Sequence, residues 1–96
     1  MRNYELIYIL RPGLEDDDKN AILEKVKNII EDGAGVLDKV DVWGERKLAY
    51  EINKYTEGYY VLIVFKAGVA VPKEVDRNLK INDKVIRHMI VNTDED

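Results

Sequence analysis

The chain has 96 residues, of which 46% are hydrophobic and 35% are charged, and its formal net charge is −4 at pH 7. This length and apolar content suit one hydrophobic core, so we expect a single domain over residues 1–96. Cysteine is absent, which excludes disulfides, thiolate metal ligands and thiol nucleophiles. The first apolar run is too short to cross a membrane and lacks a small-residue cleavage site, so we expect a soluble, unprocessed cytoplasmic protein.

The first predicted elements are a strand and an amphipathic helix. Residues 3–10 alternate at period two with apolar side chains on both faces, which is typical of a central strand. Pro12 breaks this strand, and the acidic residues from Glu15 onward predict a helix N-terminus with an aspartate cap. Gly33 and Gly35 end the helix. Its apolar stripe, spaced by three to four residues, comprises Ile22, Val26 and Ile29 or Ile30.

Two further strands are predicted to form a hairpin. Residues 36–42 alternate in part with charged side chains, and Gly44 indicates a bulge before the extended pattern resumes over residues 48–52. Residues 55–58 are typical of a turn. Residues 59–65 are β-branched and aromatic and apolar on both faces, so they predict the strongest strand of the chain.

A second helix and a closing strand complete the order. Pro72 in a first turn and the four-residue spacing of Val75 and Leu79 predict a helix that ends near residue 82, and residues 85–91 predict a strand. The order strand, helix, strand, strand, helix, strand is the α+β pattern of the ferredoxin-like fold. We therefore expect a four-stranded antiparallel sheet with two helices on one face.

In this fold the first and third strands are central, so their two faces have different surroundings. Leu6, Tyr8 and Leu10 are predicted to face the helices. The opposite, uncovered face is predicted to carry Ile7, Ile9, Tyr60, Leu62 and Val64. An exposed apolar face of this kind usually marks a binding surface.

The reactive side chains argue against catalysis. The chain has no serine, its threonines are Thr56 and Thr93, and its one histidine is His88. Almost no side chains are therefore available to form a nucleophile with a histidine base. The acidic runs at residues 15–18 and 94–96 are expected to be solvated at a helix start and in a tail. Neither a metal cluster nor a glycine-rich phosphate loop is present in the sequence. We therefore expect that the protein is not an enzyme and that it binds no cofactor, metal ion or small-molecule substrate.

The net negative charge opposes nucleic-acid binding, but the charges are unevenly distributed. Residues 73–87 carry five basic and three acidic side chains, which predicts a locally basic edge. Residues 43–55 interleave Arg46, Lys47 and Lys54 with a tryptophan and two tyrosines. Cationic groups pair with phosphates and aromatic rings stack on bases, as RNA recognition requires. The same pattern also fits an ordinary edge strand with charges outward, and the residues alone leave both readings open.

Residues 44–52, Gly-Glu-Arg-Lys-Leu-Ala-Tyr-Glu-Ile, closely resemble the signature of the bacterial small-subunit ribosomal protein six family. That signature reads Gly, any residue, Arg, a basic or polar residue, Leu, Ala, Tyr, any residue, Ile. The resemblance extends over nearly the whole chain, through residues 1–5, Pro12 and Leu14, Gly58 and Tyr59, and residues 87–89.

The resemblance implies a ferredoxin-like fold and a structural role in the bacterial small ribosomal subunit. It further implies binding to the central domain of 16S ribosomal RNA as a heterodimer with ribosomal protein eighteen, without a cofactor or catalysis. The RNA or partner contacts that it implies are Arg2, Tyr4, Arg46, Lys47, Tyr50, Lys54 and Arg87. Some family members are more basic and have longer tails than this chain, whose sequence ends in acidic residues.

Two alternatives come from other classes of protein. Residues 7–9 and 58–61 partly resemble the two aromatic motifs of an RNA-recognition-motif domain, but the basic residue expected before Gly58 is Glu57. A small ferredoxin-like enzyme such as acylphosphatase would have a similar size and strand order. Such an enzyme needs a glycine-rich anion-binding loop with an arginine, and the sequence after the first strand does not supply one.

Overall fold

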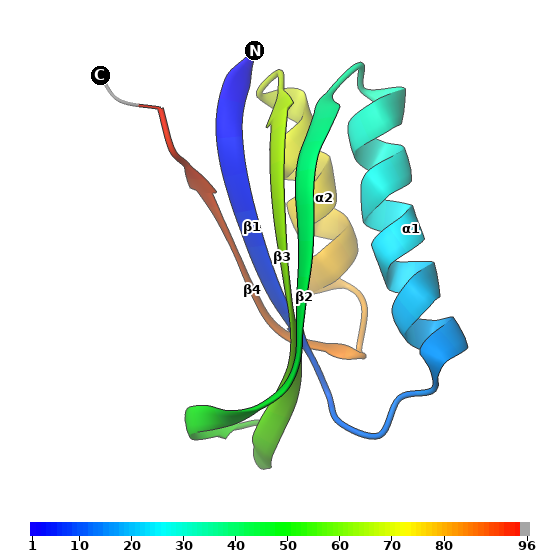
Figure 1. Ribbon diagram of the computed structural model, residues 1–96, viewed down its shortest axis with the longest axis vertical. Helices are drawn as coiled ribbons and strands as arrows, with labels where there is room; N and C mark the ends of the chain where they lie inside the picture. Colours follow the sequence, from blue (N-terminus) through cyan, green and yellow to red (C-terminus); the bar gives the residue numbers. More distant parts are fainter. Residues whose placement is uncertain (95–96) are drawn as a thin grey trace.

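A computed structural model describes residues 1–94. In chain order its elements are β1 (Arg2–Leu10), α1 (Asp16–Asp32), β2 (Val36–Ile52), β3 (Tyr55–Ala67), α2 (Ala70–Lys80) and β4 (Val85–Asn92). The strands form one antiparallel sheet in the order β2-β3-β1-β4, and both helices lie on the same side of it (Figure 1). This confirms the predicted ferredoxin-like fold. Glu95 and Asp96 of the predicted acidic tail lie outside the described residues.

The hydrophobic core lies between the sheet and the helices. Its sheet side consists of alternate residues of the two central strands, each at most 6% exposed: Tyr4, Leu6, Tyr8, Leu10, Val61, Ile63, Phe65 and Ala67. Its helix side consists of Ile22, Val26, Ile30, Val71, Val75 and Leu79. The predicted facing of the first strand is therefore confirmed. On the opposite face Ile7, Tyr60, Leu62 and Val64 are half-buried.

The helix ends are built differently from the sequence prediction. Glu15, not an aspartate, is the N-cap of α1 and makes no side-chain cap hydrogen bond, while the three aspartates lie in the first turn, where negative charge favours the helix dipole. Gly33 caps the other end with an ordinary φ of −85°. A Cβ there would lie 2.4 Å from Cγ2 of Val71, so this glycine is needed for close packing of α1 against α2. No helix within residues 1–94 is long and apolar enough to span a membrane.

The β2–β3 hairpin turns two residues earlier than predicted. Its turn is Asn53 and Lys54, with positive φ values of 50° and 70°, and Ile52 pairs with Tyr55 across it. Two consecutive positive φ values are typical of the type I′ turn, whose twist matches the flanking strands. The predicted turn at residues 55–58 was wrong, and these residues are the first part of β3. The predicted bulge at Gly44 is confirmed by a register shift and a φ of 79°.

One polar atom is left without a partner inside the core. The Tyr8 hydroxyl is buried, and no group of the described residues forms a hydrogen bond with it. Burial, with a smaller contribution from Tyr59, raises the pKa of Tyr8 well above its usual range. The hydroxyl therefore stays neutral and its desolvation is uncompensated.

Candidate nucleic-acid and partner interface

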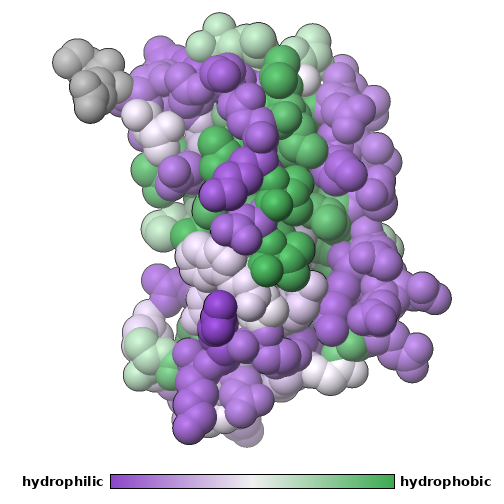
Figure 2. All heavy atoms as spheres, in the orientation of Figure 1, coloured by the Kyte–Doolittle hydropathy of each residue, from purple (hydrophilic) through white to green (hydrophobic). Residues whose placement is uncertain are grey.

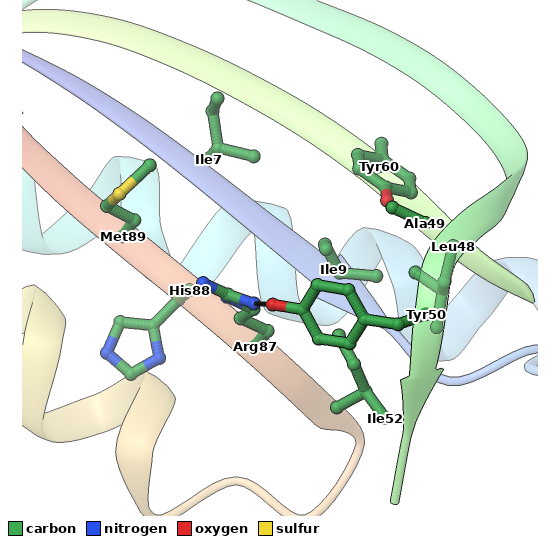
Figure 3. A pocket seen from close by; sticks show the side chains of 10 residues that line it. All are labelled: Ile7, Ile9, Leu48, Ala49, Tyr50, Ile52, Tyr60, Arg87, His88 and Met89. Carbon is green, nitrogen blue, oxygen red and sulfur yellow. Dashed lines mark hydrogen bonds between the residues drawn. The ribbon is translucent and has the colours of Figure 1, made fainter. Parts of the chain in front are cut away.

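The projecting end of the β2–β3 hairpin curls toward the sheet face that the helices leave open (Figure 1). It encloses a groove of about 250 Å³ with mostly apolar walls (Figure 3). The apolar and aromatic side chains of this wall include Ile7, Ile9, Leu48, Ile52, Tyr60 and Met89. The predicted apolar face is therefore present, but it is a concave groove beneath the hairpin instead of a flat surface.

A bulge of four residues in β2 bends the hairpin end in this way. The sheet register pairs Lys47 with Glu57 and Ile52 with Tyr55. Between these pairs β2 has residues 48–51, whereas β3 has only one residue. Because a bulge bends its strand and increases the local twist, the surplus residues carry the hairpin end over the open face.

Gly58 allows the hairpin to lie close to β1. A Cβ at this position would be 2.3 Å from Cγ2 of Ile9 and 3.4 Å from the backbone oxygen of Leu10. Only a residue without a side chain fits that space, so the approach of the hairpin to β1 depends on this glycine.

Tyr50 and Arg87, two predicted contact residues, touch each other across the open face. Nη1 of Arg87 donates a hydrogen bond to the Tyr50 hydroxyl, and the guanidinium carbon lies 5.9 Å from the centre of the tyrosine ring (Figure 3). Both side chains are exposed, and they come from β2 and β4, the two outer strands of the sheet. Sequence order alone gives no sign of this contact, because the two residues are 37 positions apart.

The basic side chains at the hairpin end are exposed and have free cationic groups. For Arg46, Lys47 and Lys54 the described residues provide no salt bridge or side-chain hydrogen bond. Figure 2 shows a largely hydrophilic surface over this end of the molecule. Glutamates on the same hairpin, at positions 45, 51 and 57, keep the local charge mixed.

Two other predicted contacts lie at the opposite end of β1. Arg2 is exposed, and near it Oδ1 of Asp94 accepts a hydrogen bond of 2.6 Å from the Asn3 side chain, which lowers the pKa of Asp94. Tyr4 is only 6% exposed, and its ring stacks on Phe65 with 5.4 Å between the ring centres. We therefore assign Tyr4 to the core, as its alternation with Leu6 already indicated.

The predicted basic edge over residues 73–87 is partly neutralised within α2. Nη2 of Arg77 lies 2.7 Å from Oε1 of Glu74, and Nζ of Lys80 lies 3.5 Å from Oδ2 of Asp76. Of the basic residues in this segment, Arg87 reaches the groove under the hairpin. The ion pairs within α2 therefore offset part of the positive charge of this segment.

His88 links β4 to α2 on the helix side of the sheet. Its Nε2 lies 2.7 Å from Oδ1 of Asp76, and its side chain is 15% exposed, so it is partly buried. The hydrogen bond from His88 is the main reason why the pKa of Asp76 lies below its usual value, and Lys80 adds to the effect. Within residues 1–94 no three His, Asp or Glu side chains gather in a way that could hold a metal ion.

Sequence reasoning missed two parts of this site. Trp43 stacks on Tyr60, with 6.0 Å between ring centres, and its Nε1 donates to Asp41 at 3.2 Å. Met89 is 52% exposed at the groove wall. The alternation of β4 could have placed Met89 on the open face, but the stack depends on the bulge at Gly44, whose effect on neighbouring side chains the sequence does not specify.

The fold and the site define the class: a ferredoxin-like α+β protein that presents a hairpin with exposed cationic side chains beside an apolar groove on its open sheet face. The model of the family "Ribosomal protein S6" matches residues 3–92. Small ribosomal subunit protein bS6 of Clostridioides difficile is 58% identical over 91 residues, covering 95% of this chain and 98% of that protein. The corresponding protein of Alkaliphilus oremlandii is 56% identical over 91 residues, covering 95% and 96% of the two chains.

A solved structure agrees with these matches. The crystal structure of 30S ribosomal protein S6 from Thermotoga maritima superposes with a TM-score of 0.88 at 34% sequence identity, covering 95% of this chain and 86% of that one. The chain therefore belongs to the ribosomal protein S6 family of the small ribosomal subunit.

Proposed function

We propose that this protein binds the central domain of 16S ribosomal RNA together with ribosomal protein eighteen, as a non-catalytic, cofactor-free component of the small subunit in the cytoplasm. Family membership supports the ribosomal setting. The observation that carries the proposal is the hairpin end, where exposed Arg46, Lys47 and Lys54 lie beside a mostly apolar groove.

The two parts of the interface suit different partners. The cations of Arg46, Lys47 and Lys54 are free to pair with phosphate oxygens, which position a protein on RNA without reading its sequence. The apolar groove suits a protein partner, because apolar side chains gain most when another apolar surface removes them from water. We propose Arg2 as a further phosphate contact, since it is exposed at the start of β1.

The alternative of a base-stacking RNA-recognition motif has less support in this arrangement. Tyr60 is the aromatic residue on the open face of β3, and the Trp43 ring already stacks on it. The neighbouring Tyr59 lies on the helix side, where it packs against the core and Nζ of Lys19 lies 4.5 Å from its ring centre. The stack with Trp43 therefore occupies one face of the Tyr60 ring.

The mixed charge of the hairpin predicts that RNA affinity depends on the partner. A protein that neutralises few phosphates gains little from counterion release, so the isolated chain should bind RNA weakly. The test is titration of central-domain 16S RNA with this protein, with ribosomal protein eighteen, and with both together at two salt concentrations. We expect tight binding only for the mixture. Equally tight binding by the isolated chain would contradict partner dependence, and no binding by the mixture would contradict the proposed function.

A further inference from the structure

The bulged part of β2 lacks the backbone support that the rest of the sheet has. The register assigns no β3 partner to residues 48–51, although they follow a well-paired stretch of strand. Strand backbone without ladder hydrogen bonds is ordinarily mobile, because only a few buried contacts hold it in place. The bulge bends β2 toward the open face, but it provides no ladder bond that would hold residues 48–51 in that position.

The contact between Tyr50 and Arg87 lies at this point. In a flat sheet of this strand order, β2 and β4 would be about 14 Å apart, because neighbouring strands are spaced by 4.7–4.9 Å. Yet the Arg87 guanidinium donates to the Tyr50 hydroxyl, and its central carbon lies 5.9 Å from the centre of the tyrosine ring. The contact therefore bridges the two outer strands of the sheet at the residues that lack a ladder partner.

We propose that Tyr50 and Arg87 form an intramolecular clasp, which holds the hairpin end over the open face and sets the shape of the groove before any partner binds. The clasp makes both residues positioning residues instead of direct RNA contacts. Its use in assembly rests on the proposed function, because the groove and the neighbouring Arg46 and Lys47 are the surface that the clasp would present.

The bond chemistry suits this role. Arginine holds its donors in a rigid planar fork and stays charged, so it can donate to the Tyr50 hydroxyl from a fixed geometry. Leu48 in the bulge and Ile52 just after it line the groove, where they supply apolar contact but no directional bond. The hydroxyl of Tyr50 is thus the group whose removal should loosen the hairpin with the least change in packing.

The first test measures hydrogen exchange in the isolated protein at the amides of residues 52–57, which flank the bulge. Tyr50→Phe and Arg87→Gln should each speed exchange by about threefold to tenfold, the loss expected for one such hydrogen bond. The double variant should exchange no faster than Arg87→Gln alone. Tyr55→Phe is the matched control, because the structure describes no hydrogen bond for that hydroxyl, and it should leave exchange unchanged. Exchange that is unaffected by Tyr50→Phe would overturn the clasp.

The second test separates positioning from direct contact in the complex with central-domain RNA and ribosomal protein eighteen. If Arg87 acts through Tyr50, Arg87→Gln should weaken assembly in the wild-type background but not in a Tyr50→Leu background, where the clasp is already gone. An equal loss in both backgrounds would mean that Arg87 touches RNA or the partner directly, and would overturn the positioning role. Failure of the wild-type protein to assemble would refute the proposed function, while hydrogen exchange would still decide whether the clasp exists.

Discussion

Replacing Gly58 with alanine should destabilise the fold by about 1–2 kcal/mol, because the new methyl group has no space. Its carbon would lie 2.3 Å from Cγ2 of Ile9, more than 1 Å closer than the roughly 3.5–4.0 Å of a normal carbon contact. Isoleucine is branched at Cβ, so Cγ2 cannot move without a change of rotamer or a shift of β1. The side chain of Ile9 is only 7% exposed and has little room to turn.

The magnitude follows from two opposing effects. Overpacking of a well-filled site costs about 1–3 kcal/mol. An alanine also lowers the conformational entropy of the unfolded chain, which stabilises the folded protein by about 0.4–1 kcal/mol where the native backbone conformation suits alanine. Gly68 is the matched control, since a Cβ there meets nothing within 4 Å and its φ is not positive. Gly68→Ala should therefore be neutral or slightly stabilising.

The assay is urea unfolding followed by fluorescence of Trp43, with the free energy of unfolding obtained by linear extrapolation. Repeating Gly58→Ala in an Ile9→Ala background isolates the contact, because that background lacks Cγ2. The cost of the alanine should then largely disappear. A Gly58→Ala protein as stable as wild type, or a cost that is the same in both backgrounds, would refute the account of the hairpin approach.

Three other predictions concern single features of the molecule. Tyr8→Phe should stabilise the protein by about 1 kcal/mol in thermal or urea unfolding, because it removes a buried hydroxyl that has no partner, and a clear loss of stability would contradict this. Arg46→Gln combined with Lys47→Gln should weaken the complex with RNA and ribosomal protein eighteen by about tenfold or more while circular dichroism shows an intact fold, since charge-assisted bonds are the stronger ones. Unchanged assembly would make these two residues ordinary solvated charges. The hydrogen bond from His88 lowers the pKa of Asp76 in the folded state. Wild type should therefore be more stable than Asp76→Asn at pH values above the unfolded-state pKa of about 3.9. This difference in the free energy of unfolding should decline as the pH falls through the lowered folded-state pKa. Urea unfolding across that pH range would show it, and a difference that did not change with pH would count against the pair.

Much of the fold follows from local patterns in the sequence. Alternation at period two assigned Leu6, Tyr8 and Leu10 to the covered face, and the helical spacing of Val75 and Leu79 predicted α2. These patterns are reliable because every second strand residue, and every third or fourth helix residue, faces the same side whatever the rest of the chain does. The strand and helix order then left the ferredoxin-like arrangement as the expected topology.

The site depended more on tertiary structure. The Asn53 and Lys54 turn lacks the usual glycine, so the sequence favoured residues 55–58, and two residues of shift changed where the hairpin ends. Tyr4 is a second example. The family resemblance suggested that it contacts RNA or a partner, but the packed core buries its ring.

By itself, the sequence determined the order of the elements, the two faces of the central strands and the family signature at residues 44–52. Only the tertiary structure decided that the hairpin curls over the open face and that Tyr50 meets Arg87. The physical reason is that periodicity records which side a residue faces within its own element. Contacts between outer strands depend on the register and on how many residues each bulge adds, which the local sequence does not specify.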